Sequence, residues 1–183
     1  MLPAQKNTAV PSRALLAVAN AIPSVLWSGL ALAPIGIYCY QFMARPWLYG
    51  FLAISLLAYA VPTSWFGYWQ LSRRPAMYRK LGVALVNRVT QNGDLVRRLI
   101  RRRYPAYRHV ASRAALAALV RTTYHQERFH LVLFLFFGLT SLHAVAHEQV
   151  GWCALLLLTN VAYNVYPMWL QQYLRVRVTP KAP

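Results

Sequence analysis

The chain has 183 residues, of which 58% are hydrophobic and 13% are charged, whereas a soluble domain carries about 25% charged residues. Its 20 Lys and Arg outnumber its 3 Asp and Glu, which gives a net charge of +17. This composition excludes an ordinary soluble domain and indicates an all-α membrane protein with one membrane domain, residues 1–183. In such a protein the positive charges set the topology and touch anionic membrane lipids, so no nucleic acid partner is expected.

Four runs without Asp, Glu, Lys or Arg predict four transmembrane helices, at 14–42, 47–71, 129–147 and 150–173. A bilayer core about 30 Å thick needs about 20 apolar helical residues, and non-helical backbone would leave polar groups unpaired in lipid. The first run also has the basic start of a cleaved signal peptide, in Lys6 and Arg13. We expect a retained helix instead, because signal cores have only about 7–15 residues.

Short connections predict that the four helices form two antiparallel hairpins. Residues 43–46 join the first pair, and Glu148 and Gln149 join the second. The N-terminal tail has two basic residues (Lys or Arg), the loop 72–128 has fourteen and the C-terminal tail has three, all of which would lie on one side of the membrane. The connections on the opposite side have only Arg45. The positive-inside rule therefore predicts a multi-pass protein of the inner or plasma membrane with both termini in the cytoplasm.

The cytoplasmic loop 72–128 is predicted to be helical, basic and amphipathic. Residues 76–89 mix apolar and basic side chains, Asn92-Gly93 marks a turn, and 95–103 is a short basic amphipathic stretch that ends before Pro105. Residues 107–124 predict another helix. Because basic amphipathic helices lie flat on membranes, we expect this loop to cover the cytoplasmic ends of the bundle.

Glu127 and His130 form the first candidate site, at the start of the third predicted span. Their i, i+3 spacing places both side chains on one helical face. A carboxylate beside an imidazole orients the ring and raises its basicity, as a general base requires. The alternative is a polar helix start, in which Glu127 sits favourably at the positive end of the helix dipole and pairs with Arg128.

A polar stripe on the fourth predicted span forms the second candidate site. Asn160, Asn164, Gln171 and Arg175 fall within about 60° of arc at about 100° per residue. Polar residues in a span usually face the interior or a cavity, although hydrogen bonding between helices would also explain Asn160 and Asn164. Pro167 should loosen this helix and free backbone carbonyls.

Other patterns predict no metal site and no soluble-enzyme motif. His143, His147 and Glu148 could hold a metal, but no clear third ligand accompanies the two histidines. Cys39 and Cys153 are expected to be apolar fillers rather than a disulfide. The chain contains no GxSxG elbow, no glycine-rich phosphate loop and no HxxxxD box, which disfavours the common hydrolase and kinase mechanisms.

The C-terminal part of the chain resembles the glycosyl-diaponeurosporenoate acyltransferase family, small membrane enzymes that acylate a glycosylated carotenoid. The family signature reads Asn, a Pro-containing apolar run, then Gln-Arg-Tyr-Asn-Arg-x-Arg. The chain keeps Asn164, Gln171, Tyr173, Arg175 and Arg177 and departs at Gln172 and Leu174, where the family usually has Arg and Asn. Glu127-x-x-His130 is similar to the family's Glu-x-x-His, and Tyr78-Arg79-Lys80-Leu81-Gly82-Val83 to its Lys-Leu-Gly segment.

The resemblance implies acyl transfer to a hydroxyl of a lipid or glycolipid acceptor at the cytoplasmic face. The donor would be a thioester co-substrate such as acyl-CoA, with no other cofactor. On this hypothesis His130 is the general base and Glu127 orients it. The residues expected to bind substrates are Asn160, Asn164, Gln171, Tyr173, Arg175, Arg177 and Arg79, with the amides on the acceptor or oxyanion and the arginines on donor phosphates.

A non-catalytic accessory subunit or lipid-binding scaffold is the competing prediction. An enzyme needs a cavity that His130 and the polar stripe both line, whereas a scaffold would bury these groups in pairs. A membrane methyltransferase or reductase is a third option, which no nucleotide-binding pattern supports. The identity of the acceptor and the oligomeric state stay open at this stage.

Overall fold

The computed structural model describes residues 10–108 and 112–178, which form helices and no strand. Lys6 and Lys181, which entered the topology prediction, lie outside the described residues, as does part of the predicted helix 107–124. In the described ranges, three helices are long and apolar enough to cross a membrane, so three of the four predicted spans have a counterpart. These are α1 (Arg13–Phe42), α6 (Arg113–Ala146) and the continuous helix Val150–Val178.

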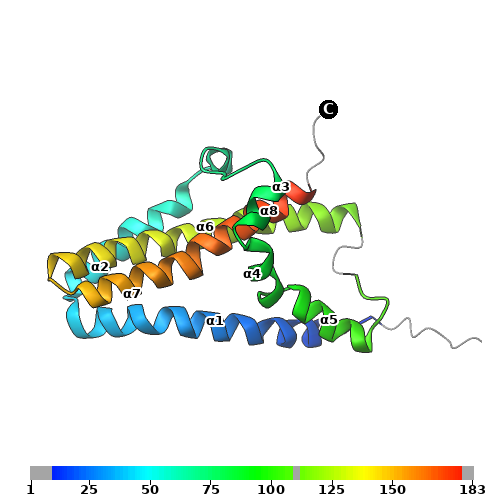
Figure 1. The fold of residues 1–183 in the computed structure, drawn as a ribbon, viewed down its shortest axis with the longest axis horizontal. Helices are drawn as coiled ribbons and strands as arrows, with labels where there is room; N and C mark the ends of the chain where they lie inside the picture. Colours follow the sequence, from blue (N-terminus) through cyan, green and yellow to red (C-terminus); the bar gives the residue numbers. More distant parts are fainter. Residues whose placement is uncertain (1–9, 109–111, 179–183) are drawn as a thin grey trace, which may run out of the picture.

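The predicted span 47–71 is not one continuous helix. It is divided into α2 (Arg45–Leu56) and two 3₁₀ helices, η1 (Leu57–Ala60) and η2 (Thr63–Gly67). Pro62 separates the two 3₁₀ helices, because proline has no backbone N–H and disfavours a helical residue before it. Val61 is accordingly extended, with a ψ of 122°. The chain therefore returns along α6 as a short helix followed by two tight turns (Figure 1).

The basic loop forms three short helices, α3 (Pro75–Lys80), α4 (Val83–Val89) and α5 (Asp94–Arg103). The mixed apolar and basic stretch 76–89 is divided between α3 and α4 at Gly82, whose φ of +76° lies in the left-handed region that glycine adopts without steric cost. Residues 113–124 of the predicted helix 107–124 belong to α6, which begins after Ser112, whereas Tyr107 and Arg108 are not helical. The Ser112 side chain caps α6 by accepting from the Ala115 N–H at 3.1 Å.

The last helix changes its winding in the middle. It consists of α7 (Val150–Asn160), the π-helical turn η3 (Val161–Val165) and α8 (Tyr166–Val178). Pro167 cannot donate to the Tyr163 carbonyl four residues earlier, and a π-turn is one way for a helix to absorb such a gap. A π-turn adds one residue and so turns everything beyond it by about 100° relative to a regular α-helix.

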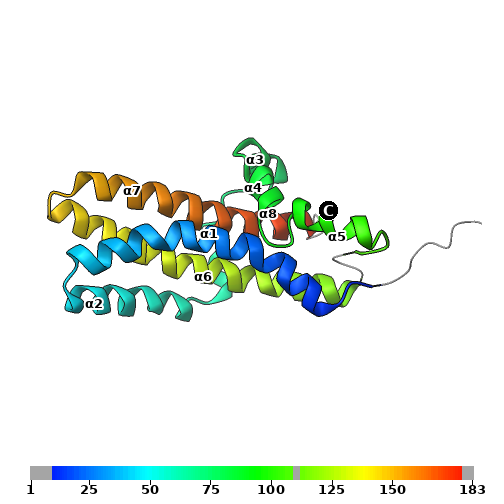
Figure 2. The ribbon, with the colours of Figure 1, turned by 90° about the horizontal axis from the view of Figure 1, so that it is seen from below.

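Two views show α1, α6 and α7–α8 side by side (Figures 1 and 2). The end of α1, the start of α2, the end of α6 and the start of α7 lie at one end of the bundle (Figure 1). Near that end Tyr38, Phe137 and Leu156 are fully buried, and Cys39 and Cys153, both free thiols, pack against their cluster. At the other end α3 and α4 pack on α8 through buried Tyr78, Val83, Leu170 and Tyr173.

Candidate functional site

Glu127 lies at the centre of a buried polar cluster that joins α6 to α8. Its carboxylate is fully buried and pairs with the guanidinium of Arg175. Gln172 Nε2 and Trp69 Nε1 also donate to Glu127, at 2.7 and 3.3 Å. We call Glu127, Arg175, Gln172 and Trp69 the anchor cluster. An ion pair withdrawn from water needs such additional hydrogen bonds to offset its desolvation.

Neighbouring side chains provide further contacts to Arg175 and Gln172 of the anchor cluster. The Arg175 guanidinium lies over the Tyr124 ring, 4.1 Å from its centroid, and its Nη1 is 3.5 Å from the Thr123 hydroxyl. The Tyr78 hydroxyl shares its one proton between the Ser72 carbonyl at 2.9 Å and the Gln172 side-chain oxygen at 3.2 Å. Burial raises the pKa of Tyr78, so this hydroxyl keeps the proton that it donates. The cluster therefore ties α3, α6 and α8 together with all its charges paired.

The predicted pairing of Glu127 with His130 is wrong. Glu127 bonds to side chains of α8 and to Trp69, whereas His130 Nδ1 lies 3.3 Å from Asn164 Oδ1. Neighbours at i, i+3 on a helix can contact each other, but the opposite charge of Arg175 on the facing helix takes the carboxylate. Glu127 thus holds two helices together and does not orient the imidazole.

A chain of amides orients His130 instead. Asn160 Nδ2 donates to the Phe134 carbonyl at 3.1 Å, and Asn164 Nδ2 donates to Asn160 Oδ1 at 2.8 Å. The Phe134 carbonyl can only accept, so Asn160 must use its Nδ2 there and has its Oδ1 left for Asn164. Asn164 therefore donates with Nδ2 and presents its Oδ1 to His130. Because that oxygen can only accept, His130 Nδ1 must carry the proton. The neutral ring therefore has its lone pair on Nε2, the form that a general base requires.

The irregular turn η3 supports the same ring. Tyr163 meets His130 edge to face, with centroids 5.6 Å apart, and its hydroxyl is 2.7 Å from the Ser28 hydroxyl of α1. Pro167 leaves the carbonyl of Tyr163 without its usual α-helical partner. The residue whose carbonyl Pro167 was predicted to free is thus the one whose ring packs on the candidate base.

A cavity of about 1140 Å³ lies between α1, α6 and the α7–α8 helix, and His130 is part of its wall. We call it the main cavity. Gln171 and Arg177 line it near the end of α8, and Leu158 lines it 19 residues before Arg177, about 28 Å along a helix at 1.5 Å per residue. The main cavity therefore runs from an apolar end to a basic end, past His130.

The turn between α4 and α5 covers part of the main cavity and is fixed to α1. The Trp27 indole N–H donates to the Val89 carbonyl at 3.1 Å, and the Asn92 N–H donates to Asn20 Oδ1 at 2.6 Å. Gln91 and Ser24 form a further side-chain hydrogen bond. The loop predicted to cover the cytoplasmic ends of the bundle thus packs over a cavity.

Besides Glu127, the predicted site residues divide into four groups. His130, Gln171 and Arg177 line the main cavity, and Asn160 and Asn164 are buried behind His130. Arg175 and Tyr173 are buried elsewhere, Arg175 in the anchor cluster and Tyr173 against Tyr78, at 6.0 Å between ring centroids. Arg79 is exposed on α3 and does not line the main cavity.

The sequence pattern missed Gln172, which is buried and bonds to Glu127. Counting about 100° for every residue placed Gln171 in the polar stripe. The extra residue in η3 turns α8 so that Gln172 joins Asn160 and Asn164, and Gln171 faces the main cavity. Pro167 was the visible signal for this change of register.

The histidines at the other end of the bundle form no metal site in the described part of the chain. No group of three His, Cys, Asp or Glu side chains able to hold a metal occurs there. His143 Nδ1 is 2.8 Å from the Tyr38 hydroxyl, and its ring stacks on His147 at 4.1 Å. His143 thus belongs to the buried aromatic packing of that end, and the exposed His147 lies on it.

Comparison with known proteins gives one finding. A family model described as glycosyl-4,4'-diaponeurosporenoate acyltransferase matches residues 62–181. The match includes the anchor cluster, His130, both asparagines and all of α8. No curated protein and no solved structure matches the chain.

Proposed function

Because the chain belongs to the glycosyl-4,4'-diaponeurosporenoate acyltransferase family, we propose that it is an integral membrane O-acyltransferase. It moves a fatty acyl group from a thioester donor such as acyl-CoA to a hydroxyl of a lipid or glycolipid acceptor, the class to which a carotenoid glycoside belongs. The reaction takes place at the cytoplasmic face of the membrane, toward which both termini and the basic loop are directed. The acceptor is itself held in the membrane and reaches the protein from the lipid bilayer.

The observation that carries this proposal is the position of His130 in the wall of a long cavity with a fixed tautomer. The amide chain from Phe134 through Asn160 and Asn164 holds the proton on Nδ1 and leaves Nε2 as a base. The main cavity has an apolar end and a basic end. Its lining residues extend about 28 Å along the α7–α8 helix at 1.5 Å per residue, which is close to the thickness of the hydrocarbon core of about 30 Å, so an acyl chain can lie along this wall.

The proposed step needs only this base and the two substrates. His130 Nε2 takes the proton of the acceptor hydroxyl while the oxygen attacks the thioester carbonyl carbon. The C–S bond then breaks, and the departing thiolate takes the proton back from the imidazolium, so atoms and charges balance. Gln171 can donate from the cavity wall to the developing oxyanion or bind the acceptor.

The basic end of the main cavity suits the phosphates of the donor. Arg177 lines it, and so does Arg97, which is also paired with Asp94 at 2.9 Å. The guanidinium groups of both residues match phosphate geometry. Arg175 is left out of this role because Glu127 already pairs with it in a buried position. Arg79 keeps a possible outer contact to the donor from the exposed side of α3.

A non-catalytic scaffold is the second candidate, and the anchor cluster is the observation that favours it. There the polar groups are buried in pairs, as a scaffold would have them. The main cavity beside His130 favours the enzyme, since a scaffold has no need of a base with a free nitrogen in a cavity wall.

The test is an acyl-transfer assay on purified protein with palmitoyl-CoA and the glycosylated carotenoid acid that the family description names. We expect His130→Gln to lower kcat by about 10²- to 10⁴-fold, the usual contribution of a general base. His147→Gln, an exposed histidine at the far end of α6, is the matched control and should keep wild-type turnover. Wild-type turnover in His130→Gln would refute the proposed mechanism.

A further inference from the structure

A second cavity, of about 630 Å³, lies between α6 and η2. We call it the basic cavity. Its α6 residues include Arg121, Tyr124 and Arg128, whereas Thr122, Gln126 and Phe129 of the same helix line the main cavity. At about 100° per residue these two sets lie on opposite faces of α6. The basic cavity is therefore separate from the proposed catalytic site.

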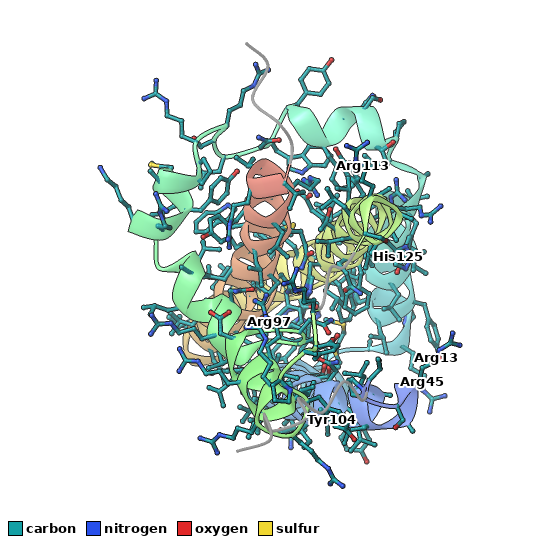
Figure 3. All side chains as sticks on the ribbon, turned by 90° about the vertical axis from the view of Figure 1, so that its right-hand side faces the viewer. Arg13, Arg45, Arg97, Tyr104, Arg113 and His125 are labelled. Carbon is teal, nitrogen blue, oxygen red and sulfur yellow. The ribbon has the colours of Figure 1, made fainter. Side chains whose placement is uncertain are left out.

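Cations and hydroxyl groups dominate the lining of the basic cavity. Arg121, His125 and Arg128 follow at i, i+4 and i+7 on α6, and Thr63 and Ser64 face them from η2. Figure 3 looks onto this end of the bundle and shows the labelled His125 on α6. Guanidinium, imidazole and hydroxyl groups together are the donors that bind phosphate oxygens.

The chain has no carboxylate to neutralise these cations. Of its three acids, Asp94 pairs with Arg97 and Glu127 pairs with Arg175. Glu148 lies 20 residues beyond Arg128, about 30 Å away at 1.5 Å per residue. Within the described residues, Arg121 and His125 form no hydrogen bond or ion pair. Their counter-ion must therefore come from outside the chain.

Arg128 offers a buried donor that has no acceptor. Its Nη2 donates to the Val61 carbonyl at 2.8 Å, and its guanidinium lies over the Phe66 ring at 5.5 Å. These contacts hold the group in place, yet its Nε is buried without a hydrogen-bond partner. A buried donor left unpaired is costly, and an anion in the basic cavity would supply the missing acceptor.

The basic cavity lies where the apolar part of α6 begins. Arg128 is followed directly by the charge-free stretch 129–147, so in the proposed orientation it lies at headgroup depth. Trp65 and Tyr68, next to the cavity on η2 and just after it, are 54% and 86% exposed. Exposed Trp and Tyr are typical of the membrane–water interface.

We propose that the basic cavity binds a phosphate ester, namely the headgroup phosphate of an anionic membrane phospholipid. The phosphate accepts hydrogen bonds from Arg121, His125 and Arg128. It joins α6 to η2, just after Pro62 separates η1 from η2. This site does not depend on the acyl transfer proposed above, because it faces away from the main cavity.

Binding to the full-length protein in a non-ionic detergent tests the proposal. The probes are short-chain phosphatidylglycerol, short-chain phosphatidylcholine, inorganic phosphate and coenzyme A, each titrated against the melting temperature. The main variant is Arg121→Gln with His125→Gln, since both side chains are exposed and form no hydrogen bond or ion pair within the described residues. The control is Arg98→Gln, at an exposed position on α5, which removes one arginine charge as Arg121→Gln does.

We expect phosphatidylglycerol to stabilise the wild-type protein and the Arg98→Gln control alike. The double variant should bind it at least about tenfold more weakly, because each hydrogen bond to a charged group is worth about a factor of ten or more. Equal affinity in the double variant would overturn the site. Equal or tighter binding of inorganic phosphate or coenzyme A, lost in the same variant, would overturn the assignment to a lipid.

Discussion

Glu127→Gln tests whether the anchor cluster holds α6 against α8. Removing one partner of a buried ion pair costs about 3–5 kcal/mol, because the other charge stays buried. Arg175 lies over the Tyr124 ring at 4.1 Å, and because this contact is present with or without the Glu127 charge, it does not change the difference between the two proteins. The free energy of unfolding should therefore fall by about 3–5 kcal/mol. At about 2–4 °C per kcal/mol for a chain of this size, the melting temperature should fall by roughly 6–20 °C.

The assay is thermal unfolding in detergent, followed by far-UV circular dichroism, on three variants. Glu127→Gln with Arg175→Met removes both charges, and a buried pair replaced by neutral groups is often nearly as stable as the original. We therefore expect the double variant to melt above Glu127→Gln alone. Glu148→Gln, an exposed acid at the other end of α6, should leave the melting temperature unchanged. A double variant that melts no higher than the single variant would refute the ion-pair reasoning.

Three further predictions address the main cavity and its support. Asn164→Leu removes the acceptor that fixes the His130 tautomer, so kcat should fall roughly 10²-fold with little change in KM, as initial rates over a range of acceptor concentrations will show. Ala162→Trp fills part of the main cavity and should lower kcat/KM for palmitoyl-CoA about tenfold more than for octanoyl-CoA; an equal loss for both donors would contradict the placement of the acyl chain. Tyr78→Phe should lower the free energy of unfolding by about 1–3 kcal/mol. Burial raises the pKa of Tyr78, so above the ordinary tyrosine pKa of about 10 the unfolded chain loses the proton first and wild-type stability declines. Melting temperatures across that range should show a shallower decline in Tyr78→Phe.

The sequence was sufficient to predict most of the fold, because charge-free runs of membrane-spanning length are hard to mistake. Hydropathy treats a run as uniform, however, and so it extended one span from 47 to 71 across Pro62. The Val61-Pro62 pair already carried the information that the helix ends, since the residue before proline avoids the helical region. The orientation of the bundle in the membrane stays a prediction from charge.

The candidate site could be predicted only in part, for a different reason. The shared face of Asn160 and Asn164 follows from helical spacing within one segment. The partner of Glu127 does not, because it lies on another helix at Arg175 and Gln172. Whether Gln171 or Gln172 faces Glu127 depends on the π-turn η3. A calculation that assigns 100° to every residue assumes a regular α-helix and cannot predict such a turn.

Pro167 has an effect far larger than the one hydrogen bond that it lacks. Asn160 at the end of α7 and Asn164 within η3 are directed toward His130, whereas Gln172 and Arg175 in α8 are directed toward Glu127. In a regular α-helix without the extra residue of η3, α8 would be turned by about 100° from its present orientation relative to α7. Either the contacts to His130 or those to Glu127 would then be lost. The missing amide proton of Pro167 therefore goes with a turn that lets one helix hold two side chains of α6, the imidazole of His130 through Asn164 and the carboxylate of Glu127 through Gln172 and Arg175.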